Sequence, residues 1–299
     1  MKTLILTLIV LLLVAAAGVG VYLITQNSQD VVHIPQNGEP TPTPPPPAQE
    51  EDEPEASIGT SVQGRDIMAY RYGSGDTELL FVGGFHGGYS WNTALVAYEL
   101  MDYLQANPNR IPGNVRVTVI PALNPDGLHR VVGREGRFTA ANVSADSATR
   151  VAGRFNANSV DLNRNFDCEW QPTATWQTRT VSPGSSAFSE PESKALRDYA
   201  QNNSPAAVVI WYAAANGVFA SACDGSILPE TRAIMNAYAN ASGYPAYDKF
   251  EFYDITGDAA NWLSKNNIPA FSVLLSTHEG TEWDKNRAGI EALLQYYAN

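Results

Sequence analysis

The chain has 299 residues, of which 44% are hydrophobic and 17% charged, and its formal net charge is −12 at pH 7. This length and apolar content exclude a disordered chain, and the presence of only two cysteines excludes a disulfide-stapled miniprotein or a cysteine-rich zinc module. The net charge is still −6 over residues 58–299, which excludes nucleic acid as the partner because binding to a phosphate backbone requires a positive surface.

The first predicted element is an apolar helix near the N-terminus. Residues 4–24 form a run of 21 residues without a charge, and a helix of that length spans about 31 Å, which matches the hydrocarbon core of a bilayer. Residues 1–24 are therefore predicted to be a membrane anchor or a signal segment, and the sequence leaves cleavage open. We expect the rest of the chain either as the extracytoplasmic domain of a single-pass protein in the cell membrane or as a secreted protein.

A proline-rich, acidic linker is predicted next, over residues 25–57. It contains eight prolines, including the run Pro44–Pro47, and the acidic stretch Glu50–Glu53. Such a composition cannot bury a core and stays extended. In polyproline geometry the linker reaches at most about 100 Å, so we expect it to act as a spacer.

Residues 58–299 are predicted to form one folded domain, because no second low-complexity segment interrupts them. Continuous apolar runs bounded by turn residues indicate buried strands, and helical patterns lie between them. The alternation predicts an α/β fold, with a mixed, mostly parallel sheet flanked by helices. The predicted strands are 79–82, 115–120, 206–212 and 270–275, and the predicted helices are 90–105, 190–201, 229–240, 257–266 and 282–297.

Unusual polar segments follow these strands, at the sheet edge where α/β proteins bind ligands. After the first strand comes a glycine-rich segment, Gly83-Gly84-Phe85-His86-Gly87-Gly88-Tyr89-Ser90-Trp91, and after the second comes Asn124-Pro125-Asp126-Gly127. Further along the chain lie Asp161-Leu162-Asn163-Arg164-Asn165-Phe166-Asp167 and Tyr253-Asp254-Ile255-Thr256-Gly257.

Taken together and in this order, these segments resemble the zinc metallocarboxypeptidase family of the carboxypeptidase A type. The resemblance extends over about 230 residues and implies a carboxypeptidase-like, phosphorylase/hydrolase-like fold. It also implies a peptidase zinc held by two histidines and one glutamate, with a separate glutamate as general base.

Three of the four metal and base positions that the family implies carry other residues here. His86 stands at the first histidine position, but Tyr89 and Ser90 occupy the two candidate positions for the glutamate ligand, and Ser90 is the predicted replacement. Tyr212 stands in place of the second histidine and Leu274 in place of the base. We therefore expect no cofactor and no retained catalytic residue.

One rescue of the metal site stays open. A sharp turn after Ser276 would return His278 or Glu279 to the site. Zinc would then be held by relocated ligands.

The residues that the family uses to grip a peptide's terminal carboxylate have counterparts here. Asn163, Arg164 and Tyr253 match this set by resemblance, and Arg164 offers a forked pair of donors that suits a carboxylate. The oxyanion-stabilising arginine is expected at Arg137, with Arg134 as the fallback. Ala260 matches the residue that lines the specificity pocket, and its small apolar side chain argues against selection of basic terminal residues.

The sequence thus predicts a metallocarboxypeptidase-like domain without hydrolytic activity that binds peptide or protein C-termini at the cell surface. The alternatives are an active zinc carboxypeptidase with relocated ligands and a purely structural surface domain. A disulfide is expected between Cys168 and Cys223, which lie outside the ligand motifs of an exported chain.

Overall fold

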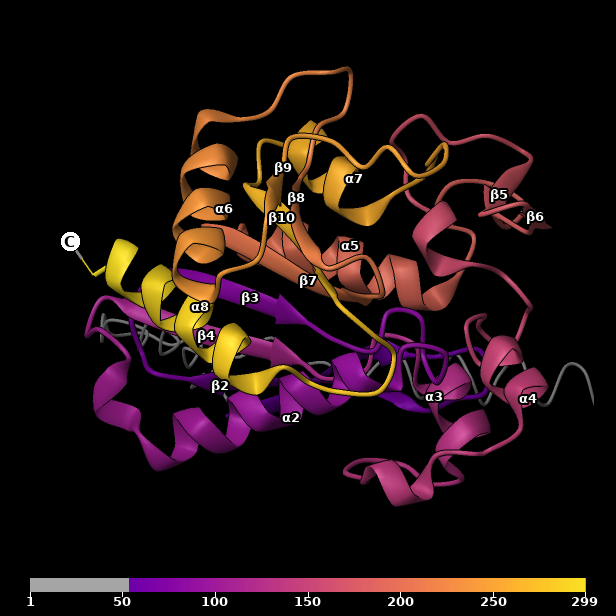
Figure 1. Cartoon of the computed structure of the whole chain (residues 1–299), viewed down its shortest axis with the longest axis horizontal. Helices are drawn as coiled ribbons and strands as arrows, with labels where there is room; N and C mark the ends of the chain where they lie inside the picture. Colours follow the sequence, from indigo (N-terminus) through magenta and orange to yellow (C-terminus); the bar gives the residue numbers. More distant parts are fainter. Residues whose placement is uncertain (1–53, 299) are drawn as a thin grey trace, which may run out of the picture. The chain divides into compact units, whose positions relative to one another are not determined.

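The computed structural model describes residues 54–298, which are built around one eight-stranded sheet (Figure 1). The order across the sheet is β1-β2-β4-β3-β7-β10-β8-β9. The strands are β1 (Glu55–Thr60), β2 (Asp66–Tyr72), β3 (Thr77–Val82), β4 (Val115–Ile120), β7 (Ala207–Ala213), β8 (Gly217–Ala220), β9 (Ala246–Tyr247) and β10 (Ala270–Leu275). A separate two-stranded ribbon pairs β5 (Ala174–Trp176) with β6 (Arg179–Val181).

The centre of the sheet is parallel and its edges are antiparallel. β4, β3, β7 and β10 run parallel to one another, whereas β1, β2 and β8 pair antiparallel with their inner neighbours. The four central strands are the continuous apolar runs of the sequence, and helices cover them on both sides. The predicted strands and the predicted fold class, a mixed and mostly parallel sheet flanked by helices, are confirmed.

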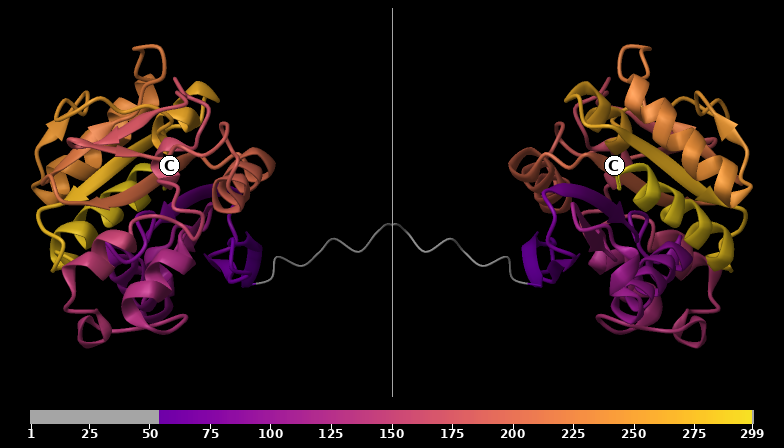
Figure 2. Two further views of the ribbon diagram at one scale, coloured as in Figure 1. Left: turned by 90° about the vertical axis from the view of Figure 1, so that its right-hand side faces the viewer. Right: turned by 90° about the vertical axis from the view of Figure 1, so that its left-hand side faces the viewer.

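Two layers of helices bury the two faces of the sheet. On one face α8 (Trp283–Tyr296) lies between α2 (Trp91–Ala106) and α6 (Pro229–Ser242), as Figure 1 shows. On the other face lie α5 (Pro191–Asn203) and α7 (Ala259–Lys265), and Figure 2 shows α5 and α8 on opposite sides of the sheet. These are the five helices that the sequence predicts, with ends shifted by a few residues.

The sequence analysis did not predict the outer strands or the two short helices α3 (Pro125–Val132) and α4 (Ser147–Ala152). β1 begins at Glu55, so the domain starts three residues before the predicted boundary at 57/58. The predicted anchor and nearly all of the predicted linker lie outside the described residues. Within residues 54–298, no helix is long and apolar enough to cross a membrane.

The segments that follow the parallel strands all begin at the same edge of the sheet. Val82 is in register with Ile120 and Ile210, and Leu275 is in register with Ala213. The segments that begin at Gly83 and Pro121 therefore start at one level, and those that begin at Ala214 and Ser276 start together three residues further along, at the same edge of the sheet. They form the setting of the candidate site.

Candidate functional site

A cavity of about 1320 Å³ lies at the edge of the sheet where β7 and β10 end. This volume exceeds the roughly 300–1,000 Å³ of common small-ligand pockets, so there is room for more than one residue of a peptide. Seven of the residues singled out in the sequence line it: His86, Asn163, Arg164, Tyr212, Tyr253, Ala260 and Leu274.

A tight glycine turn after β3 places His86 in this cavity. Gly87 has a φ of +42°, and a Cβ on it would lie 2.5 Å from the carbonyl oxygen of Gly153. Only glycine fits this close approach of two backbone segments without strain. The turn thereby fixes the backbone on which the His86 ring is mounted.

The His86 imidazole is buried and is held between aromatic rings rather than by hydrogen bonds. Its ring centroid lies 5.0 Å from that of Tyr212, and neither of its nitrogens has a hydrogen-bond partner. Its Nε2 lies 3.6 Å from Oδ1 of Asp161. Burial, together with the positive charge of Arg154, lowers the pKa of His86 to about 3, so the ring is neutral at neutral pH.

Arg154 and Asp161 form a buried ion pair beside His86 that the sequence analysis missed. Nε and Nη2 of Arg154 lie 2.9 and 2.8 Å from Oδ2 of Asp161. Burial alone would raise the pKa of Asp161, but Arg154 and His86 hold it well below its usual range. The guanidinium also stacks on Trp176, 4.4 Å from the ring centroid. No local pattern distinguishes Arg154 from the nearby Arg150, so the sequence offered no signal for it.

Of the two candidate positions for the glutamate ligand, Tyr89 lines the cavity and Ser90 does not. Ser90 is fully buried at the start of α2, and its hydroxyl has no hydrogen-bond partner. Of the two candidate positions, only Tyr89 thus has access to the cavity, and the assignment of Ser90 to the glutamate position stays a prediction.

Tyr212 and Leu274, the residues predicted at the second histidine and base positions, lie side by side in the cavity lining. Leu274 on β10 is in register with Tyr212 on β7, and both side chains line the cavity. The Tyr212 hydroxyl donates a hydrogen bond to Oδ1 of Asn163 at 2.9 Å. Burial, reinforced by the negative charges of Asp258 and Asp161, raises the pKa of Tyr212 well above 10, so this side chain is a neutral phenol.

These donors do not fit a catalytic zinc ion. Catalytic zinc in peptidases takes three protein ligands drawn from imidazole, thiolate and carboxylate groups. In the part of the chain that the structure describes, no three His, Cys, Asp or Glu side chains are grouped so that they could hold a metal ion. His86 has unpartnered nitrogens, but the phenol groups of Tyr89 and Tyr212, whose pKa values burial raises, cannot complete the set.

Asn163 is largely committed to the protein itself. Its Oδ1 accepts hydrogen bonds from the Tyr212 hydroxyl and from the backbone N–H of Ala259, and its Nδ2 donates to Asp258 at 2.8 Å. The amide nitrogen carries two hydrogens, so one N–H remains for a ligand. Asp258 is buried in the same cavity lining, two residues before Ala260, and the floor that the sequence analysis took as apolar therefore also contains a carboxylate.

Arg164 presents an unused donor to the cavity. Its Nε donates to the carbonyl oxygen of Thr175 at 3.0 Å and its Nη1 to that of Asn163 at 2.6 Å, whereas Nη2 is buried without a partner. The residue is only 1% exposed. Tyr253 also lines the cavity, and its ring lies 5.9 Å from the guanidinium carbon. A buried, unpartnered guanidinium N–H is costly unless a ligand satisfies it.

Arg137 and Arg134 are not part of this site. Arg137 is half-exposed, pairs with Asp102 at 2.7 Å and stacks over Tyr98. Neither arginine is among the residues that line the cavity. The expectation that Arg137, or else Arg134, faces the site was wrong, because spacing alone could not show that the chain runs past α3 before it returns to the cavity at Arg154.

The turn after Ser276 that the sequence analysis left open is present, and it brings back His278 but not Glu279. His278 lines the cavity with its ring 4.5 Å from that of Tyr89, and burial, together with the positive charge of Arg154, lowers its pKa. Glu279 points to the surface, 3.9 Å from Arg150. Two histidines therefore line one cavity.

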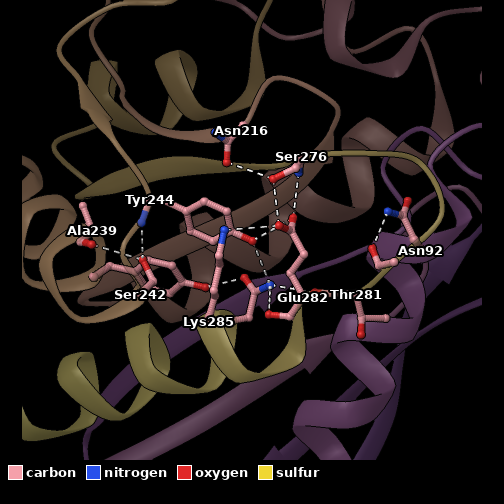
Figure 3. Close-up of polar contacts among 12 residues, drawn as sticks. Asn92, Asn216, Ala239, Ser242, Tyr244, Ser276, Thr281, Glu282 and Lys285 are labelled. Atoms are coloured by element: carbon pink, nitrogen blue, oxygen red, sulfur yellow. Dashed lines mark hydrogen bonds and ion pairs between the residues drawn. The ribbon is translucent and has the colours of Figure 1, made fainter.

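Figure 3 shows the hydrogen bonds that hold this turn in place. The Glu282 carboxylate accepts bonds from the backbone N–H and the hydroxyl of Ser276, each at 2.7 Å, and from the Tyr244 hydroxyl at 3.0 Å. From α2, the Asn92 amide donates to the carbonyl oxygens of Thr277 and Gly280 at 2.8 Å. Hydrogen bonds thus hold the turn in place at its first residue, Ser276, and further along at Thr277 and Gly280.

The predicted disulfide is confirmed, and the residues that follow its two cysteines line the cavity. Cys168 and Cys223 are bonded, with their Cα atoms 6.0 Å apart. The bridge joins the segment that follows the Asn163-Arg164 motif to the segment that follows β8. Glu169 and Asp224, the residues that come directly after the two cysteines, both line the cavity.

Comparisons with known proteins agree with this geometry. A family model described as zinc carboxypeptidase matches residues 53–281. γ-D-Glutamyl-L-diamino acid endopeptidase 1 from Lysinibacillus sphaericus is 22% identical over 242 residues, which cover 74% of this chain and 60% of that protein. Carboxypeptidase Z from Homo sapiens is 33% identical over 123 residues, 37% of this chain and 18% of that protein. The chain therefore spans about three-fifths of the first relative and under a fifth of the second.

A solved structure supports the fold. Murein-tripeptide amidase MpaA from Escherichia coli O157 matches with a TM-score of 0.56 at 19% identity, over 81% of this chain and 92% of that chain. At this identity the match shows a shared architecture, whereas chemistry is set by the residues of the site.

Proposed function

Because this chain belongs to the zinc carboxypeptidase family, we propose that its domain binds peptides by their free C-terminal carboxylate and does not hydrolyse them. The observation that carries the proposal is the Nη2 group of Arg164, which is buried in the cavity without a hydrogen-bond partner. A ligand carboxylate would satisfy this donor, and the remaining amide N–H of Asn163 lies on the adjacent residue. Tyr253, beside the Arg164 guanidinium, would cover the bound terminus.

The residues that line the cavity support the proposed lack of hydrolysis. Tyr89, Tyr212 and Leu274 line the cavity at the positions where the family has two metal ligands and a base. A phenol with a pKa well above 10 and an alkyl side chain can neither hold a zinc-bound water nor take its proton at neutral pH. Binding without turnover is what remains.

The size of the cavity and the names of the relatives support a short peptide as the ligand. One relative is an endopeptidase of γ-D-glutamyl-L-diamino acid bonds, and one structural neighbour is a murein-tripeptide amidase. We propose that short peptides of this kind, with a free carboxylate, are the ligand class. We place the domain outside the cytoplasm, on a spacer behind the apolar residues 4–24.

Titration calorimetry with matched tripeptides tests the binding proposal. The free acid should bind about tenfold more tightly than the C-terminal amide, since the amide removes a charge-assisted hydrogen bond worth roughly 1.5 kcal/mol or more. Arg164→Lys should abolish this preference, because lysine keeps the charge but loses the planar fork. Arg137→Lys, the same change outside the cavity, is the matched control. Equal affinity of the wild-type protein for acid and amide would contradict the proposal.

A second candidate function is a zinc-dependent carboxypeptidase with relocated ligands. The observation that favours it is that His86 and His278 line the same cavity, each with at least one buried nitrogen that has no partner. This candidate predicts about one equivalent of zinc in the purified protein and release of C-terminal amino acids that a chelator stops. The proposed binding function predicts neither. A purely structural domain would show neither activity nor preference for the free acid.

A further inference from the structure

A second groove lies outside the cavity, between α4 and the strand β6, which Figure 1 shows on the right-hand side of the domain. Its volume is about 640 Å³, and it shares no lining residue with the cavity that contains Arg164. Val151, Phe155 and Val181 give the groove an apolar wall and belong to one small hydrophobic cluster. The groove is therefore a separate surface with its own chemistry.

This groove is positively charged on a domain whose net charge is negative. Arg130 from α3 and Arg179 from β6 line it, and none of the described residues in its lining is an aspartate or a glutamate. Neither arginine forms an ion pair with another residue that the structure describes. The acid next to the groove in sequence, Asp146, is used to cap α4. Both guanidinium groups are therefore available to an anion.

Contacts within the protein hold the two guanidinium groups near one short stretch of the chain. That of Arg130 donates a hydrogen bond to the carbonyl oxygen of Ala152 at 3.4 Å. That of Arg179 lies over Trp176, 5.4 Å from the ring centroid, and this ring lies 6.4 Å from that of Phe155. Ala152 and Phe155 are three residues apart, and both line the groove. The two cations are thus presented together at one groove.

The backbone of β6 is open on the side that faces the groove. One side of β6 pairs with β5, and on the other side a single parallel bridge joins Ser182 to Val160. Ser159, which precedes this bridge and lines the groove, has a left-handed backbone with a φ of 62°, and it ends the pairing there. Within the described chain, Arg179–Val181 therefore has no strand beside it on the groove side. An open strand edge accepts an extended peptide as an additional strand.

We propose that this groove binds an acidic, extended segment of a partner protein, which adds a strand to β6 and places its carboxylates at Arg130 and Arg179. Charge complementarity identifies the occupant, because guanidinium groups without a carboxylate partner bind carboxylates through paired hydrogen bonds. In an extended peptide every second side chain points to the same side, at a spacing of about 7 Å. Acidic residues at alternate positions can therefore present two charges to one wall of the groove.

Calorimetry at about 50 mM salt with the peptide acetyl-Thr-Glu-Val-Glu-Thr-amide tests the proposal. Both ends of this peptide are capped, so it carries no terminal carboxylate for Arg164. Replacing both glutamates by glutamine should weaken binding about five- to tenfold, since two exposed charge pairs are lost. No binding of the parent peptide, or equal affinity for the two peptides, would overturn the proposal.

Two further analogues test the added strand. They are N-methylated at the valine or at the glutamate that follows it, and successive N–H groups of a strand point to opposite sides, so one of the two analogues lacks a donor for β6. At least one should bind about threefold or more weakly, although its charge is unchanged. If both bind like the parent, or if polyphosphate binds as tightly as the parent, the groove is a cationic surface only and the proposal is wrong.

The variants Arg130→Gln and Arg179→Gln test the assignment to this groove. Each should weaken binding of the parent peptide about two- to fivefold and should reduce the preference for glutamate over glutamine. Arg110→Gln removes an exposed arginine outside the groove and is the matched control. A thermal melt confirms that each variant is folded. Wild-type affinity in both groove variants, or an equal loss in Arg110→Gln, would contradict the assignment, and neither result affects carboxylate binding at Arg164.

Discussion

The hydroxyl of Tyr212 donates a hydrogen bond to Oδ1 of Asn163 at 2.9 Å. This bond joins the residue at the second histidine position to a residue of the carboxylate-gripping motif. Asn163 in turn donates to Asp258 through Nδ2. Tyr212, the residue that we predict at a metal-ligand position, therefore helps to orient the Asn163 amide.

We predict that metal binding can be introduced at Tyr89, Tyr212 and Leu274. The triple change Tyr89→Glu, Tyr212→His and Leu274→Glu, together with His86, places the family's ligands and base on residues that line the cavity. Zinc content measured by atomic emission should rise to about one equivalent per chain.

The matched control exchanges one position. With Ser90→Glu in place of Tyr89→Glu, the new carboxylate replaces a fully buried hydroxyl outside the cavity lining. This variant should bind no zinc and should be less stable, because it buries a charge without a partner. Equal zinc content in the two triple variants would refute the placement of Tyr89.

The buried ion pair between Arg154 and Asp161 gives a second prediction. Arg154→Gln leaves the Asp161 carboxylate buried without its main partner, which should lower the free energy of unfolding by about 3–5 kcal/mol. Adding Asp161→Asn should restore part of the loss, because the uncompensated charge is gone. Urea unfolding of the two single variants and the double variant measures the coupling, and strict additivity would contradict the interaction.

The Glu282 carboxylate gives a pH-dependent prediction. Burial alone would raise its pKa, but hydrogen bonds from Ser276 and Tyr244 lower it below the ordinary 4.5. A lowered folded-state pKa stabilises the protein above the ordinary pKa, and this stabilisation is lost as the pH falls through the folded-state value. Glu282→Gln should therefore cost about 1 kcal/mol at pH 7.

The difference in melting temperature between wild type and Glu282→Gln should shrink as the pH is lowered below 4.5. Asp284→Asn changes a carboxylate on the same helix whose side chain is 94% exposed, and it should show no comparable trend. A difference for Glu282→Gln that stays constant from pH 7 to pH 3 would disprove the role of the charge.

Loss of the disulfide should lower the stability of the domain. The bridge spans 55 residues, and the chain-entropy relation gives a loss of about 4 kcal/mol when a loop of that length is opened. Cys168→Ser with Cys223→Ser should lower the urea midpoint accordingly. An unchanged midpoint would mean that other contacts already fix this wall.

The central strands, the five helices that cover the two faces of the sheet and the disulfide could be predicted from the sequence. Continuous apolar runs and helical periodicity report burial directly, so these elements were readable from local pattern. The strands β1 and β2 could not be predicted in this way, because exposed and buried residues alternate only weakly along them. In addition, the first residues of β1 fall in the acidic segment that we interpreted as a linker.

The site was only partly predictable for a different reason. Asn163 and Arg164 lie in one short motif, whereas Arg154, Asp258 and His278 reach the cavity from separate segments. Their placement depends on loop paths that no local pattern encodes. The one-residue choice between Tyr89 and Ser90 likewise depends on where the glycine turn ends and α2 begins, a boundary that sequence reasoning fixes poorly.

The hydrogen bonds made by Glu282 and Asn92 affect how a ligand binds in the cavity. They order the His278 segment when the protein folds. A ligand that contacts this segment therefore does not have to offset the entropy cost of ordering its backbone. Ordering a loop at the moment of binding weakens affinity and slows capture. On this side of the cavity, the backbone that a bound peptide would contact is already ordered before binding.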